Sequence, residues 1–138
     1  MIRLILFLSV LCLAAAFDIR TRMIPDWIHL LIVIVSLLPP GSVHYTGVLA
    51  MLPLLFIGIT YGGIGGGDIK LVGACGLVLG LTRTYIGLIM GLCFLLVFHA
   101  GNMVFHKAMK KEIAAKEQAY PLVPFLLSGM AASVWIGG

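Results

Sequence analysis

YGGIGGGDIKL, residues Tyr61–Leu71, places five glycines, one aspartate and one lysine between two apolar runs. The flanking runs, Tyr45–Tyr61 and Ile69–Leu81, predict helices that lie in a membrane. Asp68 would then sit at the end of a membrane helix, where a charged group is costly and is usually retained for function. The segment therefore predicts a helical membrane fold that presents a carboxylate on a backbone almost free of side chains.

The composition of the 138-residue chain also indicates a membrane protein. Hydrophobic residues make up 62% and charged residues 10%, with a mean hydropathy of +1.17, outside the range of soluble domains. The formal charge of +4 does not indicate nucleic-acid binding, because the nine basic residues lie singly or in small groups between apolar runs. Neither a zinc site nor a disulfide framework is predicted, since each cysteine lies in an apolar run without CxxC spacing: Cys12, Cys75 and Cys93.

Six apolar segments predict an all-α polytopic membrane protein, a bundle of about six transmembrane helices formed by one domain over residues 1–138. Several are shorter than the roughly 20 residues that span a bilayer, so flanking residues must complete those helices or the bilayer must thin around them. The segments are Leu4–Phe17, Trp27–Leu38, Tyr45–Tyr61, Ile69–Leu81, Tyr85–Phe105 and Leu122–Ile136.

The basic residues predict the orientation of the bundle, because lysine and arginine accumulate on the cytoplasmic side. If the connection Asp18–Asp26 is cytoplasmic, only Arg3 and Arg83 lie outside, and an even number of spans places both termini outside. The connection PPGSVHY, residues 39–45, has no lysine or arginine, as expected of an outer loop. The predicted cytoplasmic set is Arg20, Arg22, Lys70, Lys107, Lys110, Lys111 and Lys116.

The first segment has an alternative interpretation as a cleaved signal peptide. MIRLILFLSVLCLAAAF, residues 1–17, has a basic residue, a short apolar core and alanines at A-x-A spacing, Ala14 and Ala16. However, Arg20 and Arg22 outnumber Arg3, which favours a retained helix in the orientation given above.

The acidic residues divide into three groups. Glu112 and Glu117 lie in the charged stretch HKAMKKEIAAKEQAY, where a short amphipathic helix at the cytoplasmic surface is expected. Asp26 follows a proline at the start of an apolar run, which predicts a helix N-cap. Asp18 and Asp68 remain without such an explanation.

Asp18 ends the first apolar segment and Asp68 begins the fourth, so both are expected at the cytoplasmic face. Two carboxylates at one depth suggest a dyad, in which the ionised acid takes a proton from water and the protonated acid donates to the scissile group. This chemistry needs no metal and no cofactor. The alternative is that both are interfacial charges balanced by Arg20, Arg22 and Lys70.

Three ordered motifs point to a known family: FDIRTRMIPDW at residues 17–27, GGGDIKL at 65–71 and YPLVPFLLSG at 120–129. The second contains the G-x-G-D signature of membrane aspartyl proteases. The first is similar to an aspartate motif followed by a hydrophobic-Pro-Asn/Asp element, and the third to a proline-containing entry to the last helix. Together they resemble the type IV prepilin peptidases over most of the chain.

The resemblance implies that Asp18 and Asp68 are the catalytic pair of an endopeptidase of the cell membrane. Its substrates would be pilin-like or archaellin-like precursors, cut on the cytoplasmic side just before their hydrophobic helix. Larger members carry paired CxxC motifs associated with N-methylation; this sequence has none, so the resemblance is to a small form lacking the methyltransferase domain.

The glycine loop suits such a substrate. Without Cβ atoms, Gly65, Gly66 and Gly67 allow an extended substrate backbone to approach Asp68, and they permit positive φ or hinging. Lys70 has two open interpretations, an electrostatic role in the site or a marker of the membrane interface.

Two other function classes stay open from sequence. A small proton- or ion-conducting subunit would use Asp18 and Asp68 as relay carboxylates, although relay acids are expected along a path through the bilayer. A non-catalytic assembly protein would leave the glycine loop unexplained.

Several conspicuous residues have structural interpretations. GxxxG spacing predicts close helix packing at two places, Gly76 with Gly80 and Gly87 with Gly91. Pro53 is expected to kink the third span. His99 is expected to be a hydrogen-bonded interior histidine rather than a proton carrier.

Overall fold

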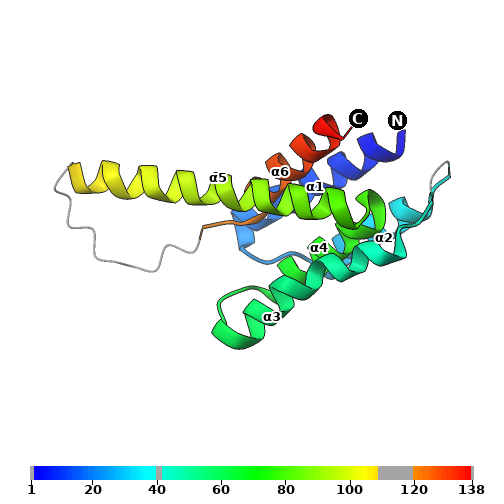
Figure 1. Ribbon diagram of the computed structural model, residues 1–138, viewed down its shortest axis with the longest axis horizontal. Helices are drawn as coiled ribbons and strands as arrows, with labels where there is room; N and C mark the ends of the chain where they lie inside the picture. The colour runs from blue at the N-terminus through cyan, green and yellow to red at the C-terminus, as the bar shows by residue number, and fades with distance from the viewer. Residues whose placement is uncertain (1, 40–41, 109–119, 138) are drawn as a thin grey trace.

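A computed structural model describes residues 2–39, 42–108 and 120–137, and within these ranges it contains no strand. The helices pack as a bundle with both chain termini at the same end (Figure 1). The predicted all-α fold is therefore confirmed. The elements are α1 Ile2–Thr21, α2 Asp26–Leu37, the 3-10 helix η1 Tyr45–Met51, α3 Leu52–Tyr61, α4 Gly66–Leu79, α5 Leu81–Ala108 and α6 Val123–Ile136.

Each predicted apolar segment is helical, but the third differs from expectation. Residues 45–51 form a 3-10 helix and the α-helix begins only at Leu52. Pro53 was expected to kink this span; instead it lies in the first turn of α3, where its missing N–H removes no intrahelical hydrogen bond. The proline therefore marks the junction of two helix types.

The centre of the bundle is α4, which packs against α2, η1, α3 and α5. Eight of its 14 residues are buried, including Leu71, Val72 and Cys75. Small residues let neighbours approach this helix closely, as in other membrane helix contacts: a Cβ added at Gly73 would lie 3.1 Å from Met51 Sδ of η1.

Gly76 confirms the predicted close packing, whereas Gly80 does not. A Cβ added at Gly76 would collide with the backbone of Gly47 in η1, and one added at Gly47 would collide with the backbone of Gly76. Gly80 instead ends α4 with φ of 85°, and its N–H donates to the Gly76 carbonyl. Its role is to terminate the helix in a conformation that favours glycine.

Gly76→Ala is expected to destabilise the protein by about 1–3 kcal/mol, because the added methyl forces the Gly47 backbone away. The matched control is Gly101→Ala on α5, where a Cβ meets nothing within 4 Å and alanine favours the helix. The measurement is the thermal midpoint of each variant in one detergent. Equal midpoints for the two variants would show that this backbone contact is not required.

The long helix α5 meets α6 through glycines and leaves most of its apolar surface uncovered. The backbones of Gly87 and Gly91 lie against Gly129 of α6, as the GxxxG spacing predicted. Elsewhere on α5, Leu96 is 66% exposed and Val97 71% exposed. Helices α1 and α5 are both long and apolar enough to cross a membrane, and lipid would remove such side chains from water.

His99 was expected in the interior, and this prediction is wrong. It lies on the exposed surface of α5, with its ring edge-on to Tyr120 at 5.4 Å between centroids. Asn102 Nδ2, one turn further along α5, donates to the Tyr120 hydroxyl at 2.7 Å. The polar end of α5 is thus tied to the chain that enters α6.

The predicted surface charges of Glu112 and Glu117 lie outside the described residues, as do Lys110, Lys111 and Lys116.

Candidate active site

Asp18 lies in the last turn of α1 and is 7% exposed. Its Oδ2 accepts a hydrogen bond from the backbone N–H of Val123 at 3.0 Å. Val123 is the first residue of α6, where the N–H groups have no intrahelical acceptor and the helix dipole is positive. The Asp18 carboxylate therefore accepts a hydrogen bond from an N–H at the start of α6 that would otherwise have no acceptor.

Asp68 lies in the first turn of α4, ahead of the apolar run that begins at Ile69, and is partly buried. Its N–H donates to the Gly65 carbonyl at 3.0 Å. Burial raises the pKa of Asp68, and the nearby Asp18 carboxylate raises it further. The fold thus brings the two predicted aspartates, 50 residues apart in the chain, close enough for the charge of Asp18 to raise the pKa of Asp68.

The glycine loop differs in conformation from the prediction. Positive φ occurs at Gly62 and Gly63, with φ of 69° and 81°, rather than at the three glycines before Asp68. Gly65 is the N-cap of α4 with φ of −65°, and Gly66 and Gly67 are already helical. The left-handed turn is therefore made at the exit of α3, where L side chains are disfavoured.

The three glycines next to Asp68 differ in their surroundings. A Cβ at Gly65 would lie 3.3 Å from Asp68 Oδ2, whereas one at Gly66 would meet nothing within 4 Å. A Cβ at Gly67 would lie 3.5 Å from Ile24 Cβ. Only Gly65 therefore leaves space that the Asp68 carboxylate itself borders.

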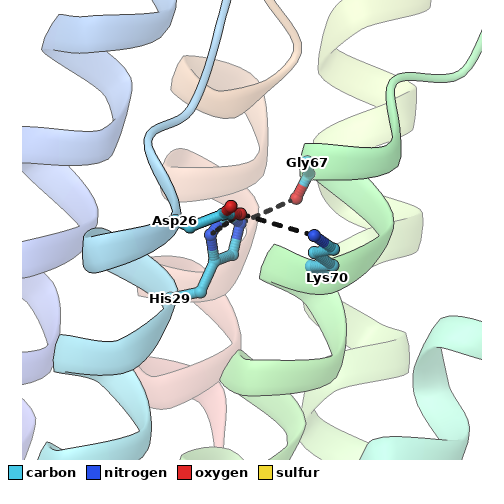
Figure 2. Close-up of polar contacts among 4 residues, drawn as sticks. All are labelled: Asp26, His29, Gly67 and Lys70. Carbon is cyan, nitrogen blue, oxygen red and sulfur yellow. Dashed lines mark hydrogen bonds and ion pairs between the residues drawn. The ribbon is translucent and has the colours of Figure 1, made fainter.

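Asp26 was expected to be the N-cap of the second helix, and this is wrong. Pro25 holds the cap position, and Asp26 is the first helical residue, without a side-chain cap hydrogen bond. Its Oδ1 instead lies 3.4 Å from Lys70 Nζ, and both side chains are largely exposed. Lys70 thus joins α4 to α2 at the rim of the site (Figure 2).

Sequence reasoning missed two groups in this region, the ring of His29 and the backbone N–H of Val123. His29 Nε2 lies 2.9 Å from the Gly67 carbonyl oxygen. The sequence holds a weak signal for each group. His29 is three residues after Asp26, so the two side chains share one face of the helix. Val123 lies between Pro121 and Pro124, which have no backbone N–H, so it is one of few possible donors at this helix start.

The alternative in which basic residues balance the two aspartates gains no support from the contacts. Across residues 2–39, 42–108 and 120–137, no ion pair joins Asp18 or Asp68 to a lysine or arginine. Lys70 pairs with Asp26 instead. A buried, unpaired carboxylate beside a second one is a pattern typical of functional sites.

The chain is similar to proteins of a known peptidase family. Residues 5–101 match the model of the type IV leader peptidase family. The chain is 31% identical to the prepilin leader peptidase/N-methyltransferase of Bacillus subtilis (strain 168), over 91% of this chain and 52% of that relative. No solved structure matches the chain.

Because the family model covers more than half of the chain, the protein belongs to the type IV leader peptidase family. The chain spans about half the length of the curated relative that it matches.

Proposed function

We propose that this protein is a membrane aspartic endopeptidase that removes the leader peptide of type IV pilin-like or archaellin-like precursors. The observation that carries the proposal is the placement of Asp18 in the last turn of α1 and Asp68 in the first turn of α4, near enough for the charge of Asp18 to raise the pKa of Asp68. Family membership supports the leader-peptidase class.

The surroundings of the two acids suggest their roles. The N–H of Val123, at the positive end of the α6 dipole, donates to Asp18, and such donors stabilise a carboxylate anion. Asp18 is therefore assigned as the base that takes a proton from the attacking water. Asp68, whose pKa is raised by burial and by Asp18, is assigned as the acid that donates a proton to the carbonyl oxygen. As the C–N bond breaks, Asp18 passes the proton taken from water to the leaving amine, and the hydroxyl of the tetrahedral intermediate returns a proton to Asp68.

The site lies at the end of α1 and the start of α4, which are cytoplasmic in the orientation predicted from the basic residues. The opposite end of the bundle holds the two residues assigned to the outside. Arg3 donates to the Ser42 carbonyl at 3.3 Å, and Arg83 donates to the Gly137 carbonyl at 2.7 Å. A single membrane-embedded domain of about six spans, cutting at the cytoplasmic face of the cell membrane, accommodates both sets of contacts.

The orientation predicts a labelling pattern. In a cysteine-free background, Arg22→Cys is expected to react with a membrane-impermeant thiol reagent only from the cytoplasmic side, and Ser42→Cys only from the outside. The measurement is labelling of intact cells against inverted vesicles. Labelling of Arg22→Cys in intact cells would overturn the orientation.

The second function class, a proton relay, is tested on the same preparation. The protein is reconstituted in proteoliposomes, and precursor cleavage and proton flux are measured side by side. We expect loss of the leader, seen as a mobility shift of the precursor, and no flux above protein-free vesicles. Flux that depends on Asp18, without cleavage of any pilin-like or archaellin-like precursor, would favour the relay.

A further inference from the structure

His29 is a buried polar residue on the second turn of α2, and it faces the N-terminus of α4 (Figure 2). It is 8% exposed. Its Nε2 lies 2.9 Å from the Gly67 carbonyl oxygen, and its Nδ1 lies 3.9 Å from Asp26 Oδ1. The side chain therefore links α2 to the first turn of α4 below the exposed Asp26–Lys70 pair.

The contact fixes which nitrogen carries the proton. A carbonyl oxygen can only accept, so Nε2 is the donor to Gly67. The 3.9 Å separation between Nδ1 and Asp26 is too long for a hydrogen bond, and Nδ1 is buried without a hydrogen-bond partner. Leaving a buried polar atom unsatisfied is costly and calls for an explanation.

The accepting carbonyl belongs to the peptide bond that joins Gly67 to Asp68. Holding this oxygen fixes the plane of the peptide unit immediately before the Asp68 Cα. The three residues before Asp68 are glycines, and a glycine backbone is not restricted by a side chain.

We propose that His29 is a positioning residue of the peptidase site, whose Nε2–H holds the Gly67 carbonyl and thereby sets the placement of the Asp68 carboxyl relative to Asp18. This inference rests on the proposed peptidase function. It assigns a role in the reaction to a residue of α2, a helix that contributes neither Asp18 nor Asp68.

A simple helix-to-helix contact would not require this arrangement. The Asp26–Lys70 pair already joins α2 to α4 at the surface, and an apolar side chain at position 29 would pack there without an unsatisfied nitrogen. The choice of histidine is explained if the hydrogen bond to Gly67, rather than packing, is what the site requires.

Three substitutions separate the hydrogen bond from packing. His29→Gln places an amide nitrogen near the position of Nε2, His29→Asn places one near Nδ1, and His29→Leu removes every donor. We expect His29→Gln to retain cleavage within about threefold, whereas His29→Asn and His29→Leu lose about tenfold to a hundredfold in kcat, as displacement of a catalytic group does. KM is expected to change little, because the substitutions displace the Asp68 carboxyl rather than remove a contact with the bound substrate.

The matched control is Asp26→Asn, one turn away on α2. It removes the exposed ion pair with Lys70 and the negative charge 3.9 Å from His29 Nδ1, but it leaves the hydrogen bond from Nε2 to Gly67 in place. Exposed pairs contribute little, so unchanged kcat is expected. Equal rates for folded His29→Gln, His29→Asn and His29→Leu would overturn the proposal, as would a loss confined to KM.

A second measurement does not depend on activity. Hydrogen exchange of the segment 65–71, followed by mass spectrometry in detergent, is expected to be faster in His29→Asn and His29→Leu than in wild type and His29→Gln. If wild type cleaves no precursor, the proposed function fails, while the exchange data still test whether His29 holds the loop. Unchanged exchange in His29→Leu would overturn the proposal even if activity were lost.

Discussion

Asp18→Asn and Asp68→Asn are each expected to abolish precursor cleavage while the protein still folds and inserts into the membrane. The amide keeps the shape of the carboxyl but can neither take a proton from water nor donate one as an acid. General acid–base groups contribute about a hundredfold to ten-thousandfold in rate, so the loss from either site is at least about a hundredfold. The measurement is the initial rate of leader removal from a pilin precursor in nanodiscs.

Asp26→Asn is the control for this pair. It removes a carboxylate on a neighbouring helix whose partner is the exposed Lys70, and its effect on cleavage is expected to be within about twofold, as for most surface ion pairs. An inactive Asp26→Asn together with an active Asp18→Asn would mean that the catalytic pair is wrongly assigned.

Gly65→Val is expected to reduce cleavage at least about tenfold in a folded protein, equivalent to about 1.4 kcal/mol of transition-state stabilisation. A Cβ at this position would lie 3.3 Å from Asp68 Oδ2, so a β-branched side chain displaces the carboxylate and narrows the approach of a substrate backbone. Gly67→Val is expected to act similarly, through Ile24 and the peptide unit that His29 holds.

Gly66→Val provides the comparison for this prediction, because a Cβ at Gly66 meets nothing within 4 Å. We expect it to lose less activity than Gly65→Val. Cleavage rates and thermal midpoints are measured together, so that a loss of rate is separated from unfolding. Near-normal cleavage by folded Gly65→Val and Gly67→Val would exclude the proposed role of the loop in substrate access.

The helices could be predicted from the sequence because their apolar runs are long and end at glycine, proline or charged residues. The fourth run, Ile69–Leu81, became α4, and its ends differ by two or three residues. The 3-10 conformation of residues 45–51 could not be predicted, because apolar periodicity does not distinguish the two helix types. It depends on the close approach of Gly47 to Gly76, a tertiary contact.

The site was only partly predictable for a similar reason. Asp18 and Asp68 stood out because they are carboxylates at the ends of apolar runs. The sequence offers only weak signals for the Val123 N–H and the His29 ring, because their contacts with Asp18 and Gly67 depend on how α6 and α2 pack. The prediction of Asp26 as a helix cap was wrong because its carboxylate pairs with Lys70 on another helix. Local sequence patterns predict where a helix ends, but they do not predict which hydrogen bonds or ion pairs a neighbouring helix makes with that end.

The most direct test of the proposed function is the intact mass of a pilin precursor after incubation with the purified protein. We predict two products whose masses sum to that of the precursor plus one water, with the new N-terminus just before the hydrophobic helix, and no products from the Asp18→Asn/Asp68→Asn double variant. Unchanged precursor with the folded wild-type protein, or the same products with the double variant, would contradict the account.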